Sequence, residues 1–168
     1  MILDIIKKSR IGLCRLLEAV LIIAVFVLVV DVIWGVFSRY VMGAQSDWTE
    51  ELARFLLVWI SLLGGAVAFG EKAHLGVDYF VGLFDSSVKK WMSVFSQLIV
   101  LFFAISIFLV GGSKVVMDTL QMEQITPALG IQQGYVYLAL PIAGIFMIIF
   151  TFENILELIL NEDQGGHS

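Results

Sequence analysis

Three ionisable side chains lie within otherwise apolar stretches of this 168-residue chain and are the first candidates for chemistry. Glu18 and Asp31 share the first apolar stretch, and Arg54 lies near the beginning of the second. A charge at the centre of a bilayer costs about 2.5 to 3.5 kcal/mol on insertion scales, so such a group is expected to pair or to act in transport. Neither a nucleophile motif, nor a phosphate loop, nor a pair of intramembrane carboxylates accompanies them in the sequence. We therefore expect no enzyme.

Histidine and cysteine are the other residue types with chemistry to offer, and both are rare. His74 and His167 are far apart, with His167 at the C-terminal tip, so a bis-histidine haem within this chain is nearly excluded. His74 is then either a polar residue of an interfacial turn or a haem ligand shared with a partner. The single cysteine, Cys14, cannot form an internal disulfide and is expected to be a small buried residue. We expect no cofactor and no metal.

The elements that must position these residues are membrane helices. The chain is 60% hydrophobic and only 15% charged, and its mean hydropathy is +0.96, which indicates an integral membrane protein. A helix needs about 20 mostly apolar residues to cross a hydrocarbon core. Residues 1–168 are therefore predicted to form a single all-α membrane domain with four transmembrane helices. The predicted spans are residues 16–38, 48–69, 91–112 and 134–158.

The basic residues set the expected orientation. Seven lysines and arginines fall on one side of the predicted spans and three on the other, so the positive-inside rule places both termini in the cytoplasm. With a net charge of −5 and this hydropathy, we expect contact with membrane lipid and none with nucleic acid. The cytoplasmic set is Lys7, Lys8, Arg10, Arg15, Lys72, Lys89 and Lys90, and the opposite set is Arg39, Arg54 and Lys114.

Two connections carry more apolar residues than a solvated linker needs. Residues 77–88 show helical spacing of apolar side chains, which predicts a short helix in the cytoplasmic interface between the second and third spans. The alternative is a plain linker that touches lipid. Residues 114–133 indicate that the third helix projects past the bilayer to meet another protein, and a self-packed loop explains the same pattern equally well.

The second span begins with four charges. Asp47 followed by Glu50 fits an N-cap with an acidic residue at the third helical position, and acidic groups favour the positive end of the helix dipole. Arg54 can pair within the helix with Glu50 or Glu51. Because the first two helices should pack antiparallel, Arg54 should also lie at the depth of Asp31. We therefore predict an Asp31–Arg54 bridge, or the pairing of one of them with another subunit.

Small residues recur at four-residue spacing further along this span, which permits another helix to approach closely. Packing against the first or third helix and docking to a second protein explain the pattern equally well. The residues are Ser61, Gly64, Gly65, Ala66, Ala68 and Gly70.

Several motifs together resemble one transporter family. They are "W-x-E-E-x-x-R-F" from Trp48 to Phe55, "W-x-x-x-L-G-G-A" from Trp59 to Ala66, "H-L-x-V-D" from His74 to Asp78, and "SRYVMG" at residues 38–43. The chain is similar to the small membrane subunit of tripartite ATP-independent periplasmic (TRAP) transporters, the DctQ family. The resemblance extends over nearly the whole chain and leans toward the sialic-acid branch.

The resemblance implies a secondary importer of organic acids in the bacterial inner membrane. A large polytopic membrane subunit would carry the sodium and substrate sites and move by an elevator-like motion. A periplasmic binding protein would capture a sialic acid or dicarboxylate, and this chain would brace the stationary part of the large subunit. Interface or structural roles then fall to Asp31, Arg39, Trp48, Glu50, Glu51, Arg54, Trp59, Gly64, Gly65, His74 and Asp78.

Two other functions remain open on the residues alone. A small, self-sufficient multidrug exporter could use Glu18 or Asp31 as its proton-coupled carboxylate. A membrane anchor of a respiratory enzyme is the second, and the lack of histidine pairs in the sequence argues against its haem-bearing forms.

Overall fold

The computed structural model describes residues 2–44, 46–71 and 86–160. Its regular elements are helices, accompanied in the described ranges by an isolated bridge between Ile125 and Gln132. Four of the helical stretches are long and apolar enough to cross a membrane, which confirms the predicted all-α class and its four spans. The elements are α1 (Ile2–Val41), α2 (Asp47–Gly70), α4 (Ser86–Phe103), the π-helical segment η1 (Ala104–Gly111), α5 (Gly112–Gln121), α6 (Gly134–Tyr137) and α7 (Ala139–Leu160).

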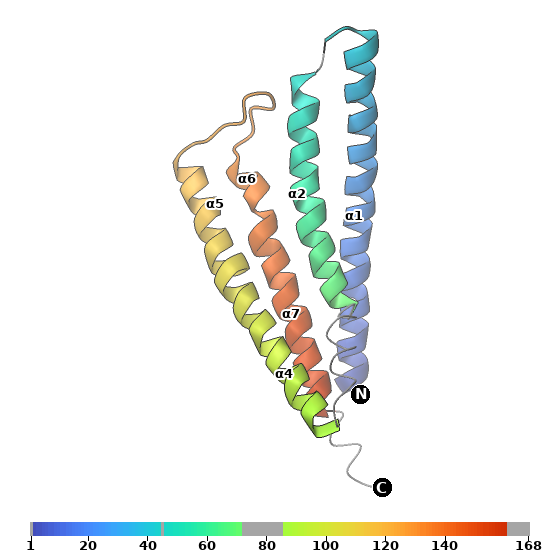
Figure 1. Ribbon diagram of the computed structural model, residues 1–168, viewed down its shortest axis with the longest axis vertical. Helices are drawn as coiled ribbons and strands as arrows, with labels where there is room; N and C mark the ends of the chain where they lie inside the picture. Colours follow the sequence, from blue (N-terminus) through green and yellow to red (C-terminus); the bar gives the residue numbers. More distant parts are fainter. Residues whose placement is uncertain (1, 45, 72–85, 161–168) are drawn as a thin grey trace.

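The helices α1 and α2 form a long antiparallel pair (Figure 1). Most of the less exposed residues of α1 recur alternately every four and every three residues, and a set of buried or half-buried residues in α2 has the same spacing, that of a left-handed coiled-coil seam. In α1 the seam consists of Arg10, Cys14, Leu17, Leu21, Ala24, Leu28, Asp31, Gly35 and Ser38, and in α2 of Thr49, Ala53, Leu56, Ile60, Leu63, Val67 and Gly70.

Two close contacts fix the register of this pair. A Cβ built on Gly35 would lie 3.1 Å from Oγ1 of Thr49, and one built on Gly70 would lie 2.6 Å from Sγ of Cys14. Both contacts belong to one register, because the same number of residues separates the two positions in each helix. Asp31 lies four residues before Gly35 in α1, and Ala53 lies four residues after Thr49 in α2. The same antiparallel register therefore places Asp31 level with Ala53.

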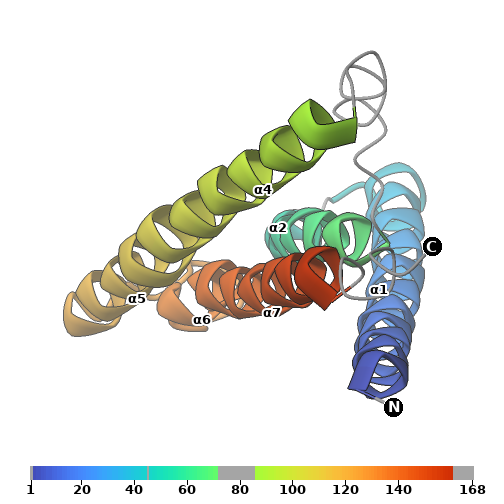
Figure 2. The same cartoon turned by 90° about the horizontal axis from the view of Figure 1, so that it is seen from below.

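The four spans form an open row rather than a closed bundle. Helix α7 contacts α1, α2, α4, η1, α5 and α6. Helix α4 and segment η1 pack on α7 and, among the described elements, contact neither α1 nor α2. Viewed along the helices, α4 lies apart from α1 (Figure 2). Such a row leaves broad helix faces exposed to lipid or to another protein.

The buried core lies toward the end where α1 begins and α7 ends. Phe150 of α7 is fully buried there, together with the small residues Ala66, Ala104 and Ala143. Cys14 belongs to the same cluster, which confirms its expected role as a small buried residue. The side chains at the core are mostly small, so the helix backbones approach one another closely.

Glycines permit the close packing of η1 and α5 on α7. A Cβ on Gly144 would lie 2.7 Å from Cβ of Phe108, and a Cβ on Gly112 would lie 2.9 Å from Cβ of Leu140. The helix is interrupted at Leu138, between α6 and α7. Pro141 has no N–H to donate to the carbonyl four residues earlier, which explains a break at this point.

The beginning of α1 and the end of α7 lie at the same end of the molecule (Figure 1). The placement of both termini in the cytoplasm stays a prediction. The third span continues through α5 to Gln121, so it extends beyond its predicted end at residue 112. The predicted interfacial helix at residues 77–88 falls mostly outside the described residues.

Candidate subunit interface

The beginning of α2 differs by one residue from the prediction. Ser46, rather than Asp47, is the N-cap residue, and its side chain makes no capping hydrogen bond. The hydroxyl of Thr49 instead donates a 2.7 Å hydrogen bond to the backbone carbonyl of Ser46. Asp47 and Glu50 both remain in the first turn, where their negative charge complements the helix dipole.

Glu51 connects α2 to the loop that precedes α6. Its Oε2 accepts hydrogen bonds from the backbone N–H groups of Ala128 at 3.1 Å and Leu129 at 2.7 Å. A carboxylate that satisfies two backbone donors holds a loop more firmly than a neutral acceptor does. Glu51 therefore holds the beginning of α2 to the loop between α5 and α6, at the end of the molecule opposite the core.

Arg54 is exposed and points away from the seam with α1. It lines an open pocket of about 370 Å³ between the beginning of α2 and the same loop, with the acidic residues of the first turns of α2 on the same wall. The lining residues are Asp47, Glu50, Glu51, Arg54, Pro127 and Ala128.

The predicted bridge between Asp31 and Arg54 is wrong for this chain. Asp31 is only 4% exposed, and neither of its carboxylate oxygens has a hydrogen-bond partner among the described residues. The predicted depth is correct, because Asp31 lies level with Ala53. Arg54, however, is rotated by about 100° around α2 from Ala53, which carries its side chain out of the seam. The alternative prediction, that Asp31 or Arg54 pairs with another subunit, remains a proposal.

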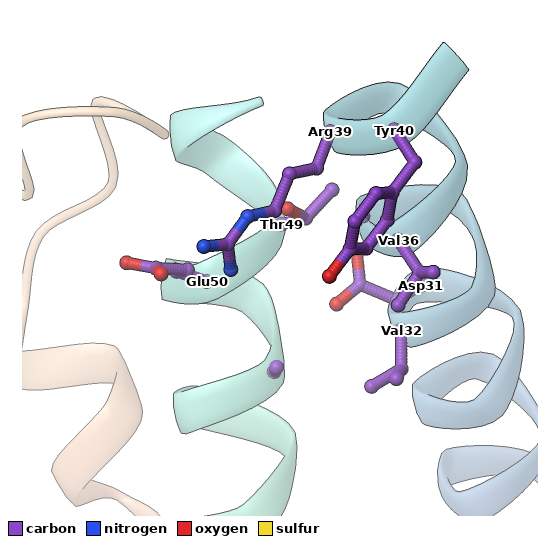
Figure 3. A pocket seen from close by; sticks show the side chains of 9 residues that line it. Asp31, Val32, Val36, Arg39, Tyr40, Thr49 and Glu50 are labelled. Atoms are coloured by element: carbon purple, nitrogen blue, oxygen red, sulfur yellow. The ribbon is translucent and has the colours of Figure 1, made fainter. Parts of the chain in front are cut away.

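Asp31 instead lines a pocket of about 280 Å³ between α1 and α2. Figure 3 shows its carboxylate and the Tyr40 hydroxyl directed into the space between the two helices. In the same view the Arg39 side chain extends across toward the side of α2 where Glu50 lies. The lining residues are Asp31, Val32, Gly35, Val36, Arg39, Tyr40, Thr49, Glu50 and Ala53.

The small residues of α2 serve two different surfaces. Ala66 and Gly70 are buried against the rest of the chain. A Cβ built on Gly64 or Gly65 would meet nothing within 4 Å, so packing inside the described chain explains neither glycine. One face of α2 stays exposed along most of its length, and we call it the α2 face. It consists of Glu50, Arg54, Leu57, Ser61, Gly65 and Ala68.

The remaining predicted positions fall in separate places. Trp59 packs against the core, whereas Trp48 is exposed at the beginning of α2. Arg39 lies in the last turn of α1, with its guanidinium carbon 6.0 Å from the centroid of the Tyr40 ring. His74 and Asp78 lie outside the described residues.

One polar cluster was not predicted from the sequence. Arg10 is buried, donates from Nε to the backbone carbonyl of Gly70, and donates from Nη1 to Oδ1 of Asn154 at 2.7 Å. Glu153, the neighbour of Asn154, is also buried and interacts electrostatically with Arg10. The available signal was that Arg10 begins the heptad spacing that continues through Cys14, but its charge suggested only membrane orientation.

The amino-acid sequence of this chain is similar to those of known membrane transport proteins. Residues 27–161 match the family described as "Tripartite ATP-independent periplasmic transporters, DctQ component". The chain is 31% identical over 132 residues to the sialic acid TRAP transporter permease protein SiaT of Haemophilus influenzae, with 79% of this chain and 20% of that protein covered. It is 29% identical to the sialic acid TRAP transporter small permease protein SiaQ of Vibrio cholerae, with 75% and 71% covered. A putative TRAP transporter small permease protein of Haemophilus influenzae is also 29% identical, with 92% and 89% covered.

Proposed function

The chain belongs to the DctQ component family of tripartite ATP-independent periplasmic transporters, and on that premise we propose that it is the small, non-catalytic membrane subunit of an organic-acid importer. It lies in the bacterial inner membrane with both termini in the cytoplasm. There it binds a large polytopic permease subunit and braces the part of that subunit that stays still during transport. Sodium drives the import, and a periplasmic binding protein delivers the substrate.

The open row of helices is the observation that carries this proposal. A self-sufficient carrier has to surround its solute with protein, whereas α4 and η1 contact α7 without reaching α1 or α2. A row of this kind suits a brace, because it offers a long side on which a larger membrane protein can pack. Apolar side chains cover much of its exposed surface, and Phe26, Ile33 and Phe102 are each more than half exposed.

We assign the contact with the large subunit to the α2 face. Small residues along this face allow the backbone of a partner helix to approach closely, and among the described residues nothing lies within 4 Å of a Cβ built on Gly64 or Gly65. Arg54 and Trp48 provide a polar and an aromatic contact near the end of the span. Glu51 and Trp59 act indirectly, by holding α2 in place through the loop and the core.

The names of the relatives support an organic acid as the substrate class. Besides the sialic acid proteins, the chain resembles the isethionate TRAP transporter permease protein DctMQ of Oleidesulfovibrio alaskensis and the C4-dicarboxylate TRAP transporter small permease protein DctQ of Pseudomonas aeruginosa. These solutes are all organic acids. The chain spans 16% of DctMQ and 20% of SiaT, so in these relatives the corresponding segment is part of a longer permease. This supports a large membrane partner for the present chain.

Uptake measurements test the function. Deletion of this chain should abolish sodium-dependent uptake of an organic acid, assayed with labelled sialic acid and succinate, and expression of the chain from a plasmid should restore it. Proteoliposomes that contain the chain alone should take up neither solute. Full uptake in the deletion strain, or uptake by the chain alone, contradicts the proposal.

The buried Asp31 favours one second candidate, the small proton-coupled exporter. That function requires the carboxylate to exchange protons while the chain moves a solute without a partner. Proton-driven efflux of ethidium from vesicles that contain only this chain, lost in Asp31→Asn, would support it. We expect no such efflux.

A further inference from the structure

We infer that the pocket between α1 and α2 is a receptor for a cationic side chain, a lysine ammonium or an arginine guanidinium, that a transmembrane helix of the large subunit inserts next to Asp31. This inference rests on the proposed function and adds to it the chemical group that the partner contributes. It assigns a role to a residue whose burial is not explained by any hydrogen bond to the described part of the chain.

Asp31 is buried within a membrane-spanning helix. Only 4% of the surface of Asp31 is exposed, and both carboxylate oxygens lack a hydrogen-bond partner among the described residues. In apolar surroundings a carboxyl group either stays protonated and neutral or, when ionised, needs a charged or hydrogen-bonding partner. Ionisable residues inside membrane spans characteristically pair with other charged groups. We therefore infer that Asp31 is one half of a pair whose other member comes from the partner subunit.

The lining of the pocket carries a net negative charge. Its nine lining residues include the carboxylates of Asp31 and Glu50 and a single guanidinium, that of Arg39, so the lining has one excess negative charge. The Arg39 side chain extends toward the side of α2 that carries Glu50 (Figure 3). The pocket thus attracts a further cation, and its volume of about 280 Å³ accommodates the end of a lysine or arginine side chain.

The pocket lies next to the α2 face. Glu50 belongs both to this pocket and to the α2 face, so a protein that packs on the α2 face lies beside the pocket. Val32 and Val36 of α1 also line the pocket and are about half exposed. They offer an apolar surface next to the carboxylate, as a neighbouring transmembrane helix requires.

Depth favours a protein side chain over a lipid headgroup. Asp31 lies eight residues, about 12 Å along the helix, before Arg39 in the last turn of α1. The ammonium of phosphatidylethanolamine lies on the water side of its phosphate, so this lipid would have to invert its headgroup to reach Asp31. A side chain from a transmembrane helix enters at that depth sideways.

Site-specific photocrosslinking tests the location. A photoreactive residue at Val36 of the tagged full chain, expressed with its native partners, should crosslink to the large subunit, and the mapped peptide should contain a lysine or arginine within one helical turn. The matched control is Val30, which has nearly the same exposure, 51% against 54%, but does not line the pocket. Crosslinks from Val36 to phosphatidylethanolamine alone, or to a peptide without a cation, overturn the inference.

Charge exchange tests the pairing. Asp31→Asn should reduce the recovered large subunit about tenfold, and replacing the mapped cation by aspartate should restore recovery with Asp31→Lys. The control Asp118→Asn makes the same change at an exposed position of α5 and should have no effect. Thermal unfolding of purified Asp31→Asn without the partner should match or exceed the wild type, because that variant removes a buried charge.

The outcomes separate the two proposals. If the wild-type chain retains a large subunit and Asp31→Asn retains the same amount, the receptor assignment is wrong and the proposed function stands. If the wild-type chain retains no large subunit, both are wrong.

Discussion

Arg10 donates a 2.7 Å hydrogen bond to Asn154, a residue 144 positions later in the chain. The same guanidinium donates to the carbonyl of Gly70, which joins α1, α2 and α7 at one point. A carbonyl at the C-terminal end of a helix is free of intrahelical partners, and a cation there also complements the helix dipole. This cluster therefore holds the three helices together at the end of the molecule where α1 begins.

Removing this side chain should lower the stability of the isolated protein. Arg10→Ala loses two charge-assisted hydrogen bonds, so we expect a loss of about 3 kcal/mol, seen as a lower melting temperature in detergent. Arg15→Ala, an exposed arginine of the same helix, should change the stability by less than about 0.5 kcal/mol. Equal melting temperatures for the two variants would show that the cluster contributes nothing.

The contact of Gly144 with Phe108 should tolerate no added methyl group. Gly144→Ala places its Cβ 2.7 Å from Cβ of Phe108, so η1 and α7 must move apart, at an expected cost of about 1 to 3 kcal/mol. Gly12→Ala is the matched control, because a Cβ there meets nothing within 4 Å. That change should leave stability equal or slightly higher, since alanine favours helix. A melting temperature for Gly144→Ala at or above that of Gly12→Ala would contradict the contact.

Glu51 should control the dynamics of the loop before α6. Glu51→Ala removes the acceptor of the Ala128 and Leu129 amides, and these two amides should exchange with deuterium about tenfold faster, which corresponds to about 1.4 kcal/mol. Glu51→Gln retains an acceptor and should give an intermediate rate. Unchanged exchange in Glu51→Ala would mean that the loop keeps its own conformation without the carboxylate.

The α2 face should be required for assembly but not for folding. Gly65→Leu fills space that is open in the isolated chain, so its melting temperature should stay near that of the wild type. The bulky side chain would separate α2 from a partner helix, and recovery of the large subunit should fall about tenfold. Gly12→Leu, a glycine of α1 that also lies in open space, should retain the partner. If both variants recover the large subunit equally well, the contact lies elsewhere.

Hydropathy and length were sufficient to predict the four spans and their order, because the bilayer imposes them on any such sequence. The antiparallel depth of Asp31 and Arg54 followed from the short connection between α1 and α2. Their contact did not follow, since depth depends on distance along the helix, whereas contact depends also on rotation around it. One residue of difference, Ala53 against Arg54, moves the guanidinium out of the seam.

Long-range polar contacts were beyond a single sequence. Nothing local to Arg10 specifies that Asn154 will lie beside it, and Glu51 looks like a helix-dipole residue until the loop at Ala128 is in place. The π-helical segment η1 also has no local sequence signal. We attribute its wider turns to the way the third span packs on α7. The motif positions of α2, in contrast, were recognisable from their residues.

Affinity purification from native membranes tests the central claim most directly. The tagged chain, extracted in mild detergent, should retain a large polytopic membrane protein in stoichiometric amount, identified by mass spectrometry. That result would establish the chain as a subunit that acts through its partner. A homodimer that retains no other membrane protein would contradict the account and make Asp31 and Glu18 candidates for proton coupling in a small exporter.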